Sequence, residues 1–290
     1  MTVVDAVKHT GAVAAAGRGD GGTLPSLARR FAQTSIVGRR ILLPTLVVTA
    51  VLLTWEYAVW LTEVPPMILA PPSAVWKMIA ANPVILSKQS LPTVIEALIG
   101  FGLAASFGIA LGTGMVLFTP LRKAIQPYVL ALQLIPKVAL APLFMVWLGV
   151  GITSRLSFAV FLGFFPVVIS TMTGLMSPDR NVVRLCESLT ATRWQIFRSI
   201  QIPYALPHIF TGLKISVTMT MIGVVVGEFV TAQEGLGYLI MFATSAAETA
   251  LVFAAIALLC TVGLALYGAV ALVELIVQKW LGVTITTGEF

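Results

Sequence analysis

The sequence predicts an all-α, polytopic membrane protein with six transmembrane helices, and three observations support this fold class. First, the 290 residues are 58% hydrophobic and only 10% charged, whereas soluble domains average about 25% charged residues. Second, the positive charges are concentrated in alternate connecting segments. Third, six apolar runs have about the length, roughly 20 residues, that crosses a bilayer as a helix. These runs are residues 41–62, 91–118, 128–150, 156–176, 209–230 and 250–277.

The distribution of lysine and arginine predicts the orientation of these helices. With the N-terminus in the cytoplasm, inner segments contain 14 of the 18 lysines and arginines, and outer segments contain Lys77, Lys88 and Arg155. The remaining residue, Lys137, lies inside the third run. Because cytoplasmic loops of membrane proteins carry an excess of these residues, we expect both termini to be cytoplasmic.

The ends of the chain differ in composition from its apolar centre. Residues 1–40 are rich in Ala, Gly and scattered charge and contain no apolar segment of a secretory signal. We expect them to form a mostly disordered cytoplasmic tail. The transmembrane domain then covers residues 41–280, and 281–290 form a short C-terminal tail. On the outer side, the Pro-Pro pair before SAVWKMIAA predicts the start of a short helix that lies on the membrane surface.

Small residues recur every four positions in the second run. They are Gly100, Ala104, Gly108 and Gly112. Such a stripe allows another helix to approach closely. We interpret it as packing within the chain, and a contact with a second copy is the alternative.

A polar stretch between the fourth and fifth runs predicts a first cytoplasmic helix. Ser177 is a candidate N-cap, and Pro178 suits the first helical position. We expect this helix to run from Pro178 to about Leu189.

A second helix follows after a bend. Thr192 and Gln195 have the spacing of a capping box, which predicts a helix from Arg193. Because the residue before a proline avoids the helical conformation, Ile202 and Pro203 predict its end. Residues 178–203 are thus expected to form two short helices with a docking surface. An amphipathic loop at the lipid headgroups is the alternative.

Four segments resemble bacterial ABC importer permeases. TATRWQIFRSIQIPYALPHIFTGLKIS resembles the EAA loop, typically EAA-x3-G followed by x9-I-x-LP, at which the permease of that family meets its ATPase. WEYAVWLTEVPPMILAPPSAVWKMI, IPKVALAPLFMVWLGVG and GEFVTAQEGLGYLIMFA resemble the branch that includes nitrate, sulfonate and taurine permeases. The resemblance covers roughly residues 50–280. It implies the MetI-like fold of type I ABC importers.

The loop departs from the family pattern at two places. Arg184 stands at the position of the motif's acidic residue, and Thr190 stands at the position of its glycine. Because threonine takes a positive φ less readily than glycine, we expect the bend to be built differently. The resemblance implies that the ATPase-coupling residues are Arg184, Glu187, Thr190, Arg193, Trp194, Phe197, Pro203 and Pro207.

Three ionisable residues inside the predicted spans are candidates for the substrate pathway, because each costs about 2.5–3.5 kcal/mol to insert. Lys137 follows Pro136, and transporters build sites where helices break at mid-depth. Glu96 is expected to pair with Lys137 or to face outer water. Glu228 is a candidate gate residue beside a glycine-containing turn. The proposed pathway set is Gln133, Lys137, Ser170, Thr173, Ser216, Thr220, Glu228 and Glu96.

Lys137 has two interpretations. It either selects an anionic solute, with Glu96 or Glu228 as its partner when the site is empty, or it forms a permanent pair with a carboxylate that only holds helices together.

The chain contains no G-x-x-x-x-G-K-[ST] motif for cradling phosphate. The resemblance therefore implies a non-catalytic subunit without cofactors, with ATP and magnesium bound by a partner ATPase. Its expected partners are a second copy of the permease, two ATPase subunits, a periplasmic or extracellular solute-binding protein and the lipid bilayer, with no nucleic acid. Its expected location is the bacterial cytoplasmic membrane.

The resemblance implies ATP-driven import of a small, anionic solute by alternating access, such as nitrate, a sulfonate, taurine or an aromatic acid. Two other classes stay open. A stand-alone secondary transporter or channel would take up solute without nucleotide. An intramembrane enzyme would turn over lipid or peptide, and would need paired catalytic groups at one depth.

Overall fold

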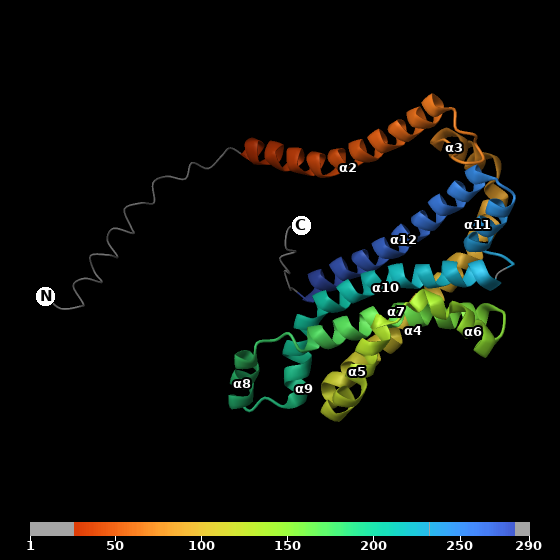
Figure 1. Cartoon of the computed structure of the whole chain (residues 1–290). Helices are drawn as coiled ribbons and strands as arrows, with labels where there is room; N and C mark the ends of the chain where they lie inside the picture. Colours follow the sequence, from red (N-terminus) through yellow and green to blue (C-terminus); the bar gives the residue numbers. More distant parts are fainter. Residues whose placement is uncertain (1–25, 232, 282–290) are drawn as a thin grey trace. The chain divides into compact units, whose positions relative to one another are not determined.

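The computed structural model describes residues 26–231 and 233–281, with side chains from Leu42 to Trp280 apart from residue 232. Every regular element in these ranges is a helix or a helical turn (Figure 1). The chain divides into two units, Met1–Leu61 and Thr62–Phe290. The all-α membrane fold predicted from the sequence is confirmed.

The described part of the first unit is helix α2, Ser26–Thr62, whose last residue already belongs to the second unit. Its segment Leu42–Thr62 is long and apolar enough to cross a membrane, as the first apolar run predicts. The helix begins earlier than residue 41, so residues 26–40 of the predicted tail are helical. Residues 1–25 of that tail, and all but the first residue of the predicted C-terminal tail, lie outside the described residues.

The second unit contains the remaining helices. Four of its segments are unbroken candidate spans: Pro83–Leu117, Ile152–Leu175, Arg193–Thr231 and Thr249–Trp280. The fifth predicted run, residues 209–230, forms part of the longer segment Arg193–Thr231. The elements in order are α3 (Pro72–Ala81), α4 (Pro83–Leu117), α5 (Thr119–Leu134), a 3₁₀ turn (Lys137–Leu140), α6 (Ala141–Leu148), α7 (Ile152–Leu175), α8 (Arg180–Ser188), α9 (Arg193–Ile196), a π turn (Phe197–Gln201), α10 (Ile202–Thr231), α11 (Leu236–Ser245) and α12 (Thr249–Leu281).

The third predicted span is broken in the middle. Segments Thr119–Leu134 and Lys137–Leu148 meet at an angle of 94°. Ile135 is extended, with φ −72° and ψ 135°, because the proline that follows it disfavours the helical conformation. The described residues therefore contain five continuous candidate spans and a sixth only if the bent pair counts as one. The predicted run 128–150 begins too late, since its first half starts at Thr119.

The centre of the second unit is the contact of α7 with α4 on one side and with α10 on the other. A Cβ atom added to Gly108 would lie 2.6 Å from Cβ of Val167, and one added to Gly112 would lie 2.8 Å from Cβ of Thr171. A Cβ on Gly223 would lie 2.6 Å from Cα of Ala159. The small-residue stripe of α4 thus packs within the chain, as predicted.

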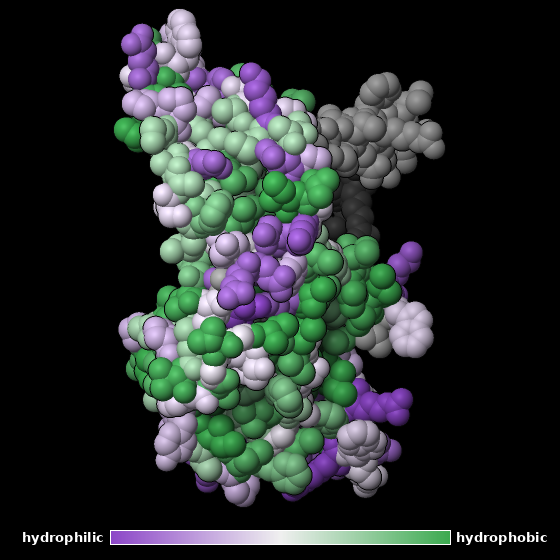
Figure 2. All heavy atoms as spheres, turned by 90° about the vertical axis from the view of Figure 1, so that its right-hand side faces the viewer, coloured by the Kyte–Doolittle hydropathy of each residue, from purple (hydrophilic) through white to green (hydrophobic). Residues whose placement is uncertain are grey.

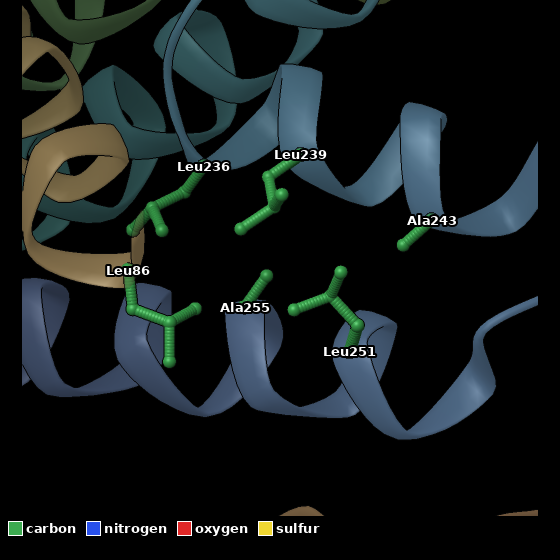
Figure 3. Close-up of a cluster of buried hydrophobic side chains, with 6 residues drawn as sticks. All are labelled: Leu86, Leu236, Leu239, Ala243, Leu251 and Ala255. Atoms are coloured by element: carbon green, nitrogen blue, oxygen red, sulfur yellow. The ribbon is translucent and has the colours of Figure 1, made fainter. Parts of the chain in front are cut away.

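A second apolar cluster joins α11, α12 and the start of α4. Figure 3 shows its six side chains pointing toward one another between the α11 and α12 ribbons, with Leu86 entering from α4. The short helix predicted from SAVWKMIAA is α3, and its Met78 and Ile79 pack against this cluster. α11 has only 10 residues, about 15 Å, so it cannot cross a membrane alone.

The two ends of the second unit differ in what they carry. Figure 1 shows α3, α6 and α11 at one end and α8 and α9 at the other. Figure 2 views the first of these ends, where a cluster of hydrophilic side chains interrupts a largely hydrophobic surface. Large apolar side chains such as Trp76, Val146 and Trp147 are exposed. Soluble proteins rarely expose so much contiguous apolar surface, which supports the membrane assignment.

The glycine contact between α4 and α7 is testable by two alanine substitutions on one helix. Gly108→Ala should destabilise the protein by about 1–3 kcal/mol, because the new Cβ meets Val167. Gly102→Ala is the matched control, since nothing lies within 4 Å of its added Cβ, and alanine favours a helix by about 1 kcal/mol. Thermal unfolding of the purified protein in detergent measures both. Equal melting temperatures for the two variants would contradict the packing described.

Candidate functional site

The first candidate region is the bent unit formed by α8 and α9. Its first helix begins at Arg180, two residues later than the predicted Pro178. The N-cap is Asp179, whose Oδ1 accepts a hydrogen bond from the Asn181 N–H at 2.8 Å. The predicted cap Ser177 instead donates its hydroxyl to the carbonyl of Gly174 at 2.8 Å. The prediction of Ser177 is wrong because its side chain serves the preceding helix, α7.

The bend after α8 has the hydrogen bonds of a glycine-type helix end although it lacks glycine. Thr190 has φ +62°. The N–H of Ala191 donates to the carbonyl of Cys186 at 3.0 Å, and the N–H of Thr190 donates to that of Glu187 at 3.0 Å. These two bonds define a Schellman motif. The prediction of a differently built turn is therefore wrong, because the helix-ending bonds hold Thr190 in the strained conformation.

The second helix starts as predicted but does not end where predicted. The capping box is confirmed: the Thr192 N–H donates to Oε1 of Gln195 at 2.7 Å, and the Gln195 N–H donates to Oγ1 of Thr192 at 3.3 Å. The predicted end at Ile202–Pro203 is wrong. A π turn over Phe197–Gln201 leads directly into α10, and this wider turn accommodates the missing N–H of Pro203. Arg193–Thr231 is one segment of 39 residues.

The eight predicted coupling residues occupy different environments. Trp194 is exposed and stacks on the buried ring of Phe197, with 5.6 Å between the ring centroids. Arg184 and Glu187 line a hollow beneath α8. The sequence analysis does not single out three exposed apolar residues of α8, Val182, Leu185 and Leu189. Their spacing places them on one helix face, a pattern that can be recognised in the sequence. Thr190 and Arg193 are exposed, and Pro203 and Pro207 are half-buried in α10.

The second candidate region is the break between α5 and α6. Lys137 is half-buried at the start of the 3₁₀ turn. Its Nζ donates to the carbonyl of Gln133 at 3.3 Å and lies 5.5 Å from the centroid of the Phe165 ring. In the part of the chain that the structure describes, the salt bridges are Arg155–Glu96 and Lys214–Glu274. Lys137 thus has no carboxylate within ion-pair distance there.

Glu96 does not pair with Lys137 and does not face outer water, so both predictions for it are wrong. It is 1% exposed and binds Arg155, which is 7% exposed. Arg155 Nε donates to the two carboxylate oxygens at 3.0 and 3.1 Å, and its NH2 group lies 2.5 Å from Oε1. The prediction that Arg155 belongs to an outer segment is also wrong. A charge can be buried between α4 and α7 because its partner is buried with it.

Glu228 caps the N-terminus of α11 from the neighbouring helix α10. Its Oε2 accepts from the Gly237 N–H at 2.6 Å, and its Oε1 accepts from the Thr93 hydroxyl at 2.7 Å. The Leu236 N–H donates to Oγ1 of Thr93 at 2.8 Å, and the Gly235 N–H donates to Oε1 of Gln89 at 2.7 Å. These groups satisfy backbone donors that a helix start leaves free. We call the four-residue set Gln89, Thr93, Glu228 and Gly237 the α11 clamp.

Glycine is required at the clamp. Gly235 has φ +112°, and a Cβ on Gly237 would lie 2.8 Å from Cβ of Glu228. Glu228 is only 1% exposed. Its carboxylate binds the start of α11 and Thr93. Glu228 therefore does not pair with Lys137, and this prediction is wrong.

The polar side chains predicted to line the substrate pathway do not lie around a single path. Ser216 and Thr220 are buried on α10 against Gly163 of α7. Ser170 is half-buried opposite Gly212. Thr173 and Gln133 are exposed. Among the predicted pathway residues, the structure brings Lys137 next to Gln133, and Ser216 next to Thr220 at Gly163.

Spanning helices with one broken span, and a capped, bent unit at one end, define a multi-pass membrane protein. Residues 102–280 match the family described as binding-protein-dependent transport system inner membrane component. This range is more than half of the chain, which therefore belongs to this family of ABC transporter permeases. The resemblance predicted from the sequence is confirmed. Membership implies an ATPase and a solute-binding protein as partners.

Similar proteins differ in the solutes for which they are named. The riboflavin transport system permease protein RibX of Chloroflexus aurantiacus is 35% identical over 79% of this chain and 86% of its own length. The formylaminopyrimidine transport permease protein ThiX of Halalkalibacterium halodurans is 32% identical over 82% and 95%. The taurine transport system permease protein TauC of Escherichia coli is 30% identical over 73% and 80%.

The α11 clamp predicts a measurable effect of its carboxylate. Glu228→Ala should destabilise the protein by about 1–3 kcal/mol, because it leaves the Thr93 hydroxyl and the Gly237 N–H buried without an acceptor. Glu228→Gln keeps one acceptor oxygen and should lose less. Glu234→Ala removes an exposed carboxylate nearby and serves as the control. Thermal unfolding in detergent ranks the three variants, and an unchanged melting temperature for Glu228→Ala would exclude the clamp as a stabilising contact.

Proposed function

We propose that this chain is the membrane subunit of an ATP-driven importer in the bacterial cytoplasmic membrane, with both termini in the cytoplasm. Two copies form the pathway at their interface. Two ATPase subunits dock on the α8–α9 unit and hold the ATP and magnesium, and a soluble binding protein delivers solute to the outer end. The chain itself performs no chemistry and binds no cofactor.

The observation that carries this proposal is that α9, part of the α8–α9 unit, continues directly into the spanning helix α10. The capping box of α9 opens a segment that runs without a break from Arg193 to Thr231. At about 1.5 Å per residue, its 39 residues extend over roughly 58 Å. A displacement of α9 by a partner is therefore passed along α10 to Glu228, and through the clamp to α11.

The solute proposed is a small organic anion. Lys137 lies at a helix break, half-buried and without a carboxylate partner among the described residues. Broken helices are where transporters build solute sites, and a charge in a water-poor site interacts strongly with an arriving anion. The Phe165 ring beside Nζ adds an apolar wall that suits the organic part of such a solute.

ATP-driven uptake by the reconstituted complex tests the proposed function. The permease, its cognate P-loop ATPase and the solute-binding protein are placed in vesicles of bacterial lipid. We expect accumulation of radiolabelled solute only when ATP is supplied to the side with the ATPase. Uptake by the permease alone without nucleotide would indicate a stand-alone transporter or channel and would contradict the proposal.

The role of Lys137 is tested by removing its charge. In the same vesicles, Lys137→Gln should lower uptake of taurine or benzoate at least about tenfold, since a lost charge-assisted contact amounts to about 1.5–3 kcal/mol. ATPase copurification and basal ATP hydrolysis should stay unchanged. Lys77→Gln, at an exposed lysine of α3, is the control.

Two outcomes would count against the anion site. Poor assembly of the Lys137→Gln complex would indicate a structural lysine. Uptake of neutral riboflavin alone, unchanged by the substitution, would contradict the anionic solute while leaving the transport function intact.

A further inference from the structure

The end of α7 and the helix α8 enclose a hollow with arginine side chains in its wall. Its volume is about 330 Å³, and Arg180, Arg184 and Glu187 of α8 line it. These three residues are spaced four and three positions apart, which places them on one face of the helix. We call this space the arginine hollow. The rest of its wall is largely apolar and comprises Leu175, Met176, Pro178, Val183 and Gln201.

A third arginine reaches the same place from another helix. Arg122 of α5 is half-buried, and its Nη1 donates to Sδ of Met176 at 3.1 Å. Among the residues whose side chains the structure describes, the ion pairs are those of Arg155 and Lys214. Arg122, Arg180 and Arg184 therefore have no carboxylate within ion-pair distance in this part of the chain, and their charges are available to a ligand.

Two carboxylates lie near these arginines along the chain, and neither neutralises them. Asp179 caps α8, since its Oδ1 accepts a hydrogen bond from the Asn181 N–H at 2.8 Å. Glu187 lies seven positions beyond Arg180 in α8, which is about 10 Å along the helix axis. The positive end of the arginine hollow is therefore the end with Arg180 and Met176, which Arg122 also reaches.

The length of α7 places the arginine hollow at the depth of the lipid headgroups. α7 has 24 residues, which extend over about 36 Å. The hydrocarbon core of a bilayer is about 30 Å thick, and the headgroup regions increase the thickness to about 40–45 Å. When α7 crosses the bilayer, Leu175 and Met176 at its end thus lie in a headgroup layer, among phosphate groups. In the proposed orientation this layer is the cytoplasmic one, whose anionic lipids attract basic side chains.

An apolar groove extends from the same end of the helices into the membrane. It has a volume of about 660 Å³ and is lined by residues of α4, α5, α6 and α7. Close to the hollow it includes Leu121, the neighbour of Arg122 in α5. On α7 it extends to Ser157, about 27 Å along the helix from Leu175. Such a groove suits a hydrocarbon chain, so the two features together match a lipid better than a free phosphate ion.

We propose that the arginine hollow binds the phosphate group of an anionic phospholipid, and that an acyl chain of this lipid lies in the groove between α4 and α7. Guanidinium groups bind phosphate through parallel N–H donors. The lipid thereby joins the ends of α5 and α7 to α8, and it fixes the position of the α8–α9 unit. This inference rests on the proposed function for the orientation of the chain in the membrane.

Lipid titration of the purified permease in detergent, without any ATPase, tests the site. Phosphatidylglycerol should raise the melting temperature of the wild type more than phosphatidylcholine does, because a ligand of the folded state stabilises it. Arg180→Gln combined with Arg184→Gln should weaken the apparent affinity for phosphatidylglycerol at least about tenfold, since two charged contacts to the phosphate are lost. Arg193→Gln combined with Arg198→Gln is the matched control. It removes the same charge from two exposed arginines that do not line the hollow, and it should titrate like the wild type.

Three further variants distinguish a site from a general effect of charge. Arg122→Gln should also weaken binding, although it lies on another helix. Arg180→Lys combined with Arg184→Lys keeps the charge and should restore part of the affinity. Glu187→Gln should strengthen binding, because it removes a carboxylate from the wall. Full affinity of the Arg180→Gln, Arg184→Gln variant, or an equal loss in the matched control, would overturn the proposed site.

Inorganic phosphate and glycerol 3-phosphate identify the source of the phosphate group. Neither should stabilise the wild type at concentrations at which phosphatidylglycerol saturates it. Stabilisation by inorganic phosphate as strong as that by phosphatidylglycerol, and lost in the Arg180→Gln, Arg184→Gln variant, would assign the hollow to a soluble anion and overturn the lipid proposal. A failed lipid titration leaves the importer function standing, whereas solute uptake by the wild type without any ATPase would overturn the importer and leave the lipid titration as measured.

Discussion

The packing of α7 between α4 and α10 is the constraint on which the second unit depends. Gly108 and Gly223 face atoms that leave no room for a Cβ, so the backbones of these helices approach closely. Lipid supplies no hydrophobic drive for helix association, and such contacts replace it with close van der Waals packing. Because a shift of α10 along α7 would bring larger residues into these positions, we expect the three helices to move together as one block.

The buried ionisable groups of this block, Glu96, Arg155 and Glu228, each have a partner on another helix. The Glu96 carboxylate and the Arg155 guanidinium neutralise one another across α4 and α7. The Glu228 carboxylate instead accepts from the backbone N–H of Gly237 at the start of α11. Both carboxylates resemble substrate-binding groups in the sequence, since ionisable residues in a span are functional candidates. Their geometry assigns them to holding the helices.

What the sequence predicts correctly is local. The apolar runs, the Thr192–Gln195 capping box and the small-residue stripe of α4 each depend on residues within a few turns of one another. The partners of the buried acids could not be found in this way, because Arg155 is 59 positions from Glu96 and Thr93 is 135 positions from Glu228. The continuation of α9 past Pro203 was also missed, since a π turn leaves no clear trace in composition.

The broken span is attached to the block differently from the other helices. α6 meets α7 through aromatic rings, with Phe144 lying 5.4 Å from both Phe158 and Phe161 between ring centroids. Ring contacts join side chains, which can change rotamer, whereas the glycine contacts fix the distance between two helix backbones. We therefore expect the segment with Gln133 and Lys137 to rearrange more easily than the α4–α7–α10 block. Under the proposed import function, the candidate solute site would lie on the element that rearranges more easily, and the α4–α7–α10 block would connect it to the α8–α9 unit.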